Sequence, residues 1–282
     1  MRNRSDDSRI GLYRPGMSSP FRREQLTIGR DAILLDTLDH LRSAADRKSK
    51  HHFLFLGPRG IGKSHLLAVI EDRLAEDPRL ASRMVVARFP EESIRTLSFA
   101  DLLKQLVSIL AIRLADEPQW KELCAKLVQV QEANEVVDLV VPLLRRTNEL
   151  KKRTVVVMIE NLNELFSKQI RQDQQIGAIR KFFMDKNGCL LIGTAPMHFD
   201  AVTDVAQPFY DFFDTQLLQP FDKEQSVTLL QKTRALDGKS DTNAEKDLSH
   251  VVMALHDMTG GNPRLMVMTC ELIVREKIET AK

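Results

Sequence analysis

The stretch Gly57-Pro58-Arg59-Gly60-Ile61-Gly62-Lys63-Ser64 occupies every fixed position of the pattern G-x-x-x-x-G-K-[ST], which is typical of phosphate-binding loops. Residues 52–56, just before it, are apolar and aromatic and predict a short buried strand. Residues 64–74, just after it, carry apolar side chains at the spacing of an amphipathic helix. A strand, a glycine-rich turn and a helix form the setting that this pattern requires.

The residue types of this loop suit a bound phosphate chain. Glycines at 57, 60 and 62 let successive backbone N–H groups converge on phosphate oxygens, and the start of the following helix adds its positive dipole end. Lys63 is expected to reach the β- and γ-phosphates, and the Ser64 hydroxyl to bind Mg²⁺. A tight glycine turn with a solvated lysine is the alternative. The predicted nucleotide-binding residues of the loop are Gly57, Pro58, Arg59, Gly60, Ile61, Gly62, Lys63, Ser64 and His65.

The charge of the chain gives no general case for nucleic-acid binding. The 282 residues carry a formal net charge of +2 at pH 7. Residues 1–30 differ, because they hold seven arginines against three acids. With scattered Ser, Gly and Pro, residues 1–20 read as a flexible basic arm; a contact with DNA phosphates or with a partner protein is the other interpretation.

Cysteine spacing and hydropathy indicate the compartment. Cys124, Cys189 and Cys270 are odd in number and far apart, so neither a disulfide framework nor a zinc site is expected. No apolar run approaches the length of a membrane span, and the arginine-rich start lacks the apolar stretch of a signal peptide. We therefore predict a cytoplasmic protein that does not enter the membrane.

Strand-like runs alternate with helical segments, which indicates an α/β fold: a five-stranded parallel sheet with helices on both faces. Between the second and third strands, residues 98–150 keep helical spacing throughout and predict a long helical crossover. The expected strands are residues 52–56, 84–89, 154–159, 189–193 and 215–218.

Pro220 follows the last expected strand, and the rest of the chain shows only helical patterns. Helices are expected at residues 223–236, 244–258 and 263–279, the last two separated by a turn with two glycines, Asn262 and Pro263. The predicted domains are the arm at 1–20, a nucleotide-binding α/β domain at 21–219 and a small helical lid at 220–282.

Glu160 ends the apolar strand at 154–159, where phosphate-loop proteins place an acid that holds the Mg²⁺ water shell. A strand that simply meets solvent at its first charge is the alternative reading. The next residue is Asn161, whose amide can orient a water molecule but cannot accept its proton. Slow turnover or a mainly ATP-switched protein therefore remains open beside brisk hydrolysis, and Glu164 could replace the missing acid.

Two further residues are candidates for contact with the γ-phosphate. Thr194 ends the strand at 189–193, where its hydroxyl could hydrogen-bond the γ-phosphate or the attacking water; it could also simply cap the strand. Arg264 begins the last helix, from which a guanidinium in a lid could sense the nucleotide. A solvated arginine at a helix start is the other reading.

These segments together resemble the AAA+ superfamily and, within it, the bacterial and archaeal ATPases near the origin-recognition and STAND groups. The resemblance spans residues 21–275. It implies ATP and Mg²⁺ as ligands, Ile28 and Gly29 at the adenine, Thr194 as sensor 1 and Arg264 as sensor 2. The segments that carry it are Ile28-Gly29-Arg30-Asp31, the loop at 57–64, residues 155–161, Leu191-Ile192-Gly193-Thr194 and Gly260-Gly261-Asn262-Pro263-Arg264.

The chain departs from this family pattern at two places. Asn161 stands where the catalytic glutamate is usual. Residues 208–214 carry acids where these ATPases commonly have an arginine that reaches a neighbouring subunit. Arg171 or Arg180 could take that role, or could be ordinary surface residues.

The favoured hypothesis is an ATP-binding switch with ATPase activity that acts on a partner protein, on a second copy of itself or in a DNA-linked process such as transposition, replication or phage defence. The alternative is a non-hydrolysing scaffold that uses ATP only to assemble, with residues 98–150 and the aromatic residues 209–213 as contact surfaces. A small-molecule kinase is a third reading, for which the sequence offers no spare base.

Overall fold

The computed structural model describes residues 18–46, 49–90, 96–170, 172–185, 189–236 and 244–280. The chain divides into two compact units. One combines Met1–Leu35, Gly57–Asp72 and Leu217–Lys282, and the other combines Asp36–Leu56 and Arg73–Gln216. The phosphate loop therefore belongs to the same unit as the C-terminal helices. This division into units does not test the predicted domain boundaries at 20 and 220, which stay predictions.

A five-stranded sheet runs through the described part of the chain in the order β2-β3-β4-β1-β5. The pairs β1–β4, β2–β3 and β3–β4 are parallel, so the predicted α/β fold is confirmed. The strands are β1 (Phe53–Leu56), β2 (Met84–Arg88), β3 (Thr154–Ile159), β4 (Cys189–Ala195) and β5 (Asp214–Leu217).

All residues of β1, β3 and β4 are buried, which explains why these strands read as continuous apolar runs. Leu54, Val157 and Leu191 share one core cluster with the crossover helices. On β1, the ring of Phe53 lies 5.6 Å from that of His40, which belongs to α3 (Asp31–Ala45). The strands are therefore covered on both faces.

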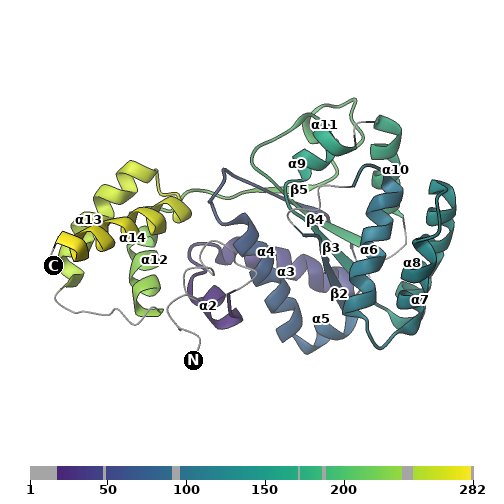
Figure 1. Cartoon of the computed structure of the whole chain (residues 1–282), viewed down its shortest axis with the longest axis horizontal. Coiled ribbons are helices and arrows are strands. Elements are labelled where there is room, and N and C mark those ends of the chain that lie inside the picture. The colour runs from purple at the N-terminus through teal and green to yellow at the C-terminus, as the bar shows by residue number, and fades with distance from the viewer. Residues whose placement is uncertain are drawn as a thin grey trace. The chain divides into compact units, whose positions relative to one another are not determined.

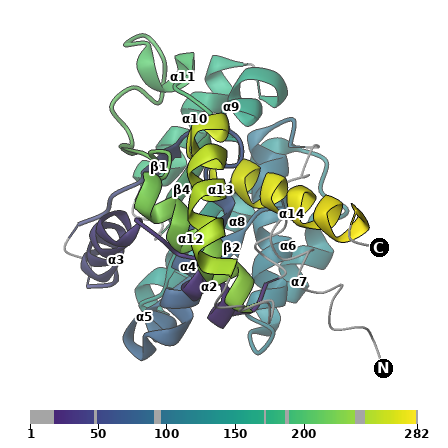
Figure 2. The ribbon, with the colours of Figure 1, turned by 90° about the vertical axis from the view of Figure 1, so that its left-hand side faces the viewer.

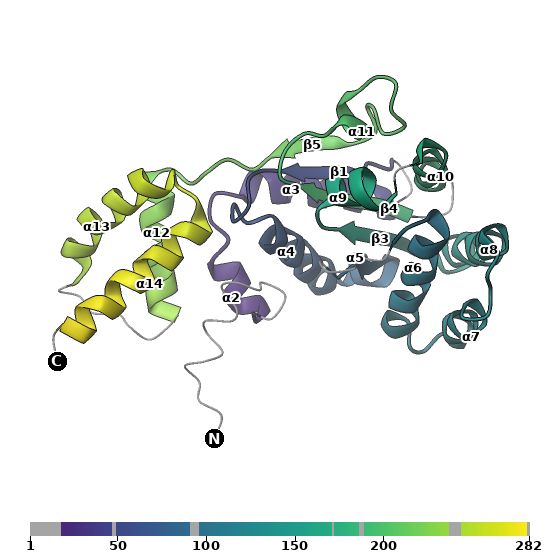
Figure 3. The ribbon, with the colours of Figure 1, turned by 45° about the horizontal axis from the view of Figure 1, so that its top comes forward.

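The predicted crossover at 98–150 folds into α6, α7 and α8, which pack against one another beside the sheet (Figures 1 and 3). Ser98 caps α6 by accepting a hydrogen bond from the Asp101 N–H. Trp120 of α7 is completely buried, and its Nε1 donates to Glu117. Besides most of α3, this unit contains α5 (Pro78–Arg83), α6 (Phe99–Arg113), α7 (Pro118–Leu127), α8 (Ala133–Lys151), α9 (Leu162–Glu164), the π-helical turn η2 (Leu165–Gln169), α10 (Asp173–Met184) and α11 (Asp200–Thr203).

One residue of the aromatic segment 209–213, Phe209, is part of the core. Phe209 is completely buried, stacks on Phe166 at 4.7 Å and contacts Phe212 and Phe213. The Phe209 ring is thus held inside the unit, whereas Tyr210 is 41% exposed, so a contact surface at residues 209–213 stays a prediction.

In the other unit, the C-terminal helices α12 (Lys223–Leu236), α13 (Ala244–Thr259) and α14 (Pro263–Thr280) pack against one another (Figure 2). Their core holds Leu230, Val252 and Met266, and Ile28 from the N-terminal segment packs into it. The same unit contains α2 (Pro20–Gln25) and the first part of α4 (Lys63–Glu76). None of the helices in the described residues is long and apolar enough to cross a membrane.

Candidate functional site

The phosphate loop begins directly after β1, at the carboxyl edge of the sheet. Gly57, Gly60 and Gly62 have φ values of 151°, 88° and 105°, which side chains disfavour. A Cβ atom on Gly57 would lie 2.9 Å from Ile61 Cγ2, so the loop closes tightly there. A Cβ on Gly62 would meet nothing within 4 Å, so the space beside Gly62 is open.

The functional side chains of the loop start α4. Lys63 Nζ donates to the carbonyl oxygens of Gly57, at 2.5 Å, and Pro58, at 3.2 Å. The ammonium thus lies against the loop from which it is expected to reach phosphate. Lys63, Ser64 and His65 form the first turn of α4, where backbone N–H groups are directed out of the helix end. Backbone donors, a lysine and a hydroxyl suit a Mg²⁺-bound phosphate chain.

His65 joins the loop to the N-terminal segment. Its Nε2 lies 3.1 Å from Thr27 Oγ1, which in turn donates to the Arg23 carbonyl. Burial, reinforced by the nearby Arg23 charge, lowers the pKa of His65 to about 4, so the imidazole is neutral at physiological pH. Arg23 itself forms a bidentate pair with Asp72 of α4. His65 therefore supports the loop through neutral hydrogen bonding.

Arg30, which had no role in the sequence-based prediction, links the loop to residues 219 and 221 after β5. Its Nη2 donates to the carbonyls of Ile61, at 3.3 Å, and Gln219, at 2.7 Å. Its guanidinium carbon lies 5.1 Å from the Phe221 ring centroid, a cation–π arrangement. Burial lowers the Arg30 pKa. The signal in the sequence was the Ile-Gly-Arg segment itself, but only the structure gives its partners.

The two residues expected at the adenine lie beside residues of the C-terminal segment. Ile28 is 8% exposed and packs among Phe221 and apolar residues of α12, α13 and α14. Gly29 has φ +61°, and a Cβ there would lie 2.3 Å from Gln225 Nε2. The adenine contact of both residues stays a prediction.

The turn before α14 lies directly on the phosphate loop. Asn262 Nδ2 donates to the Arg59 carbonyl at 3.0 Å, and the Arg264 N–H donates to the Gly60 carbonyl at 3.3 Å. Gly60 permits this approach, because a Cβ there would lie 2.7 Å from Asn262 Oδ1 and 2.9 Å from Arg264 Cβ. The backbone of Arg264 is therefore at the loop, while a contact of its side chain with a phosphate stays a prediction.

The remaining predicted residues belong to the other unit. Glu160 follows β3, and its Oε1 lies 2.7 Å from Nη2 of Arg88 at the end of β2. Asn161 has a left-handed backbone, φ 53° and ψ 49°, and its N–H donates to Thr194 Oγ1 at 3.2 Å. Thr194 is paired in register with Phe55, so β3, β4 and β1 end at one edge of the sheet. The loop continues from that edge, which is where ligands bind in open α/β sheets.

Sequence reasoning missed Arg88 because its partner is set by strand pairing. The register places Arg88 beside Met158, two residues before Glu160. Of the arginines considered for a neighbouring subunit, Arg180 is half-buried on α10, and Arg171 lies outside the described residues, as does the basic arm up to residue 17.

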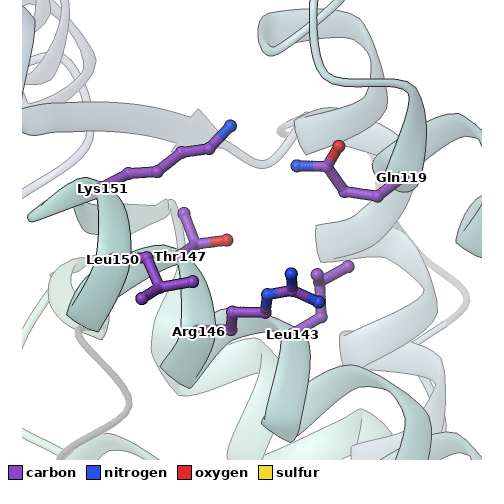
Figure 4. A pocket seen from close by; sticks show the side chains of 6 residues that line it. All are labelled: Gln119, Leu143, Arg146, Thr147, Leu150 and Lys151. Atoms are coloured by element: carbon purple, nitrogen blue, oxygen red, sulfur yellow. The ribbon is translucent and has the colours of Figure 1, made fainter.

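A separate cavity of about 320 Å³ lies between α7 and α8. Figure 4 shows its lining, which includes none of the predicted nucleotide-binding residues. The lining residues are Gln119, Leu143, Arg146, Thr147, Leu150 and Lys151.

Comparison with solved structures supports the fold. The chain is similar to the Walker-type ATPase of Pyrococcus abyssi, with a TM-score of 0.56 and 16% identity over 90% of this chain and 75% of that one. It is similar to the Aeropyrum pernix ORC2 protein in its ADP form, with a TM-score of 0.62 and 14% identity over 87% and 63% of the two chains. It is also similar to the Aeropyrum pernix ORC1 protein in complex with DNA, with a TM-score of 0.58 and 16% identity over 86% of this chain and 61% of that one.

This chain therefore spans about three fifths of the length of those two origin-recognition proteins. No curated protein matches the sequence. A family model described as the AAA ATPase domain matches residues 27–175, more than half of the chain. The predicted resemblance to AAA+ ATPases of the origin-recognition type is confirmed, and the chain belongs to the AAA ATPase domain family.

Proposed function

We propose that this AAA+ module binds ATP with Mg²⁺ at residues 57–65 and hydrolyses it as a nucleotide-controlled switch. The observation that carries the proposal is the geometry of the loop: three glycines at positive φ precede Lys63 and Ser64 in the first turn of α4. In this proposal Lys63 leaves its carbonyl partners to bind the β- and γ-phosphates. Bound Mg²⁺ would neutralise phosphate charge, with Ser64 and Glu160 holding its ligand shell.

Asn161 and Thr194 have proposed roles in positioning water. The hydrogen bond from the Asn161 N–H to the Thr194 hydroxyl fixes both residues at the edge of the sheet where β1 continues into the loop. Asn161 supplies an amide where a carboxylate would accept a proton, so turnover is expected to be slow. This substitution also favours the alternative, a scaffold that binds ATP without hydrolysing it.

Replacement of Lys63 by alanine tests the proposal. ATP affinity of the Lys63→Ala variant is expected to fall at least about tenfold, since a charge-assisted hydrogen bond is lost. Fluorescence titration with a labelled ATP analogue and a phosphate-release assay measure both properties with and without Mg²⁺. Lys121→Ala, at an exposed lysine of α7, is the matched control.

The outcomes separate the two functions. Unchanged binding and turnover in Lys63→Ala would overturn a nucleotide site at this loop. Tight ATP binding by the unmodified protein with no phosphate release, even with DNA added, would select the scaffold. The similar Aeropyrum pernix ORC1 protein is in complex with DNA. For this chain DNA, a protein partner, a second copy and a cytoplasmic location are proposals.

A further inference from the structure

Asn262 holds two segments of the first unit with one side chain. Its Oδ1 accepts a hydrogen bond from the Leu265 N–H at 3.3 Å, which caps α14. Its Nδ2 donates to the Arg59 carbonyl at 3.0 Å. Its own carbonyl accepts from Met266 in the next turn of α14. The side chain is therefore part of the helix start and a partner of the phosphate loop at once.

The bond to Arg59 fixes the orientation of a peptide group in the loop. In a planar trans peptide, the carbonyl of one residue and the N–H of the next point in opposite directions. Because the Arg59 carbonyl points to Asn262, the Gly60 N–H points away from the turn. The adjacent Gly60 carbonyl is likewise held by the Arg264 N–H. The turn before α14 thus binds the carbonyls of Arg59 and Gly60, and the Gly60 N–H points away from that turn.

The close approach depends on the absence of a side chain at Gly60. A Cβ there would lie 2.7 Å from Asn262 Oδ1, too close for any real contact. Without Asn262, the peptide between Arg59 and Gly60 would lose a partner that holds its plane, and glycine offers little steric resistance to rotation.

We propose that Asn262 is a positioning residue: it orients the Gly60 N–H for phosphate binding and transmits nucleotide occupancy from the loop to α14. This inference rests on the proposed nucleotide site. It differs from a role for Arg264, because Asn262 acts through the loop backbone and needs no contact with phosphate.

Two substitutions separate this role from capping. Asn262→Asp keeps an equally good cap for α14 but sets a carboxylate oxygen against the Arg59 carbonyl. Asn262→Ser also keeps a cap, is uncharged and is too short to reach Arg59. Asn148→Asp is the matched control, because Asn148 Nδ2 also donates to a backbone carbonyl, that of Arg153 at 3.3 Å, in the other unit.

The measurements are ATP and ADP affinities by titration with fluorescent analogues, hydrogen exchange in α14 with and without ATP, and thermal unfolding. Both Asn262 variants are expected to bind ATP about tenfold more weakly, the loss of one well-placed hydrogen bond. ATP-dependent protection of α14 should disappear, while thermal unfolding without nucleotide and the Asn148→Asp control stay close to the unmodified protein.

Three results would overturn the inference. Both variants could bind ATP and protect α14 as the unmodified protein does. They could lower thermal stability while keeping ATP affinity and protection, which is the result of a purely structural cap. Finally, if the unmodified protein binds no ATP and Lys63→Ala changes nothing, the proposed function fails first, and the inference fails with it.

Discussion

Arg88 and Glu160 form an ion pair across two neighbouring strands, with Arg88 Nη2 2.7 Å from Glu160 Oε1. The side chains are only 17% and 6% exposed. The β2–β3 register brings the two strand ends together, so the pair depends on the sheet order. Glu160, the carboxylate proposed to hold the Mg²⁺ ligand shell, therefore has Arg88 as a cationic neighbour. Removal of Arg88 should change the stability of the protein measurably.

We expect Arg88→Met to lower the free energy of unfolding by about 2–4 kcal/mol, because it leaves a buried carboxylate without this partner. The double variant Arg88→Met/Glu160→Leu should recover much of that loss, since no charge stays behind. Urea unfolding of Arg88→Met, Glu160→Leu and the double variant, without nucleotide, measures the coupling energy between the two side chains. Lys121→Met, at an exposed position, is the control. Strict additivity of the two single losses would contradict a direct interaction.

The turn before α14 gives a second prediction, based on two adjacent glycines. Gly260 and Gly261 have φ values of +60° and +70°, but only at Gly261 would a Cβ meet another group, the Phe221 carbonyl oxygen at 2.1 Å. Gly260→Ala should therefore cost only the backbone strain, about 1–2 kcal/mol. Gly261→Ala should cost clearly more, because the turn must also move away from Phe221.

Thermal unfolding of the two alanine variants checks this prediction. The Phe221 N–H donates to the Gly261 carbonyl at 2.9 Å, so displacement of the turn also breaks this bond. Equal losses in the two variants would mean that strain alone decides the stability of the turn.

A third prediction concerns Arg264, the expected sensor 2 residue. Its backbone N–H is fixed at the loop, so its side chain starts from a defined position near the proposed phosphate site. In Arg264→Ala, ATP binding should persist, while phosphate release falls about tenfold or more because a charge-assisted contact is lost. Arg113→Ala, at an exposed arginine of α6, is the control.

Limited proteolysis with and without ATP gives a second readout for Arg264. The unmodified protein should change its cleavage pattern on ATP addition, and Arg264→Ala should not. If both proteins give the same ATP-dependent pattern, Arg264 does not sense the nucleotide.

Local patterns in the sequence were sufficient for the sheet and the loop. All five predicted strands lie within two residues of the observed ones at each end. For β1, β3 and β4 the reason is that buried parallel strands are apolar on both faces, whereas β5 has no buried residue. The glycines of the loop are needed for positive φ, which makes the motif readable without a structure. The turn that precedes Arg264 was readable for the same reason, because Gly260 and Gly261 also have positive φ.

Pairings between distant residues could not be read from the sequence. The bond from Asn262 to Arg59 joins residues 203 positions apart, and the pair Arg88–Glu160 depends on which strands are neighbours. The left-handed backbone of Asn161 is likewise invisible in sequence, although asparagine adopts it more readily than most residues. Hydrophobic patterns fix which residues are buried, whereas these contacts depend on the three-dimensional register.

A final prediction follows from His52, just before β1. Its Nδ1 accepts a hydrogen bond from the Leu191 N–H at 3.0 Å, and its ring stacks on Phe212. Burial, with the nearby Lys50 charge, lowers the pKa of His52 to about 3 from 6.5. Between these values the unfolded chain binds a proton that the folded chain does not, so the free energy of unfolding decreases as pH falls.

The stabilisation from neutral His52 is therefore complete above about pH 6.5, and about 2 kcal/mol of it is lost between pH 7 and pH 5. His65, with a pKa of about 4, adds to the same slope. In His52→Asn the amide oxygen can still accept from Leu191, but nothing titrates there, so the pH dependence should become flatter. Urea unfolding at pH 7, 6 and 5 measures the slope, with His198→Asn at an exposed position as control. An unchanged slope in His52→Asn would mean that His52 is protonated in the folded protein, in conflict with its bond to the Leu191 N–H.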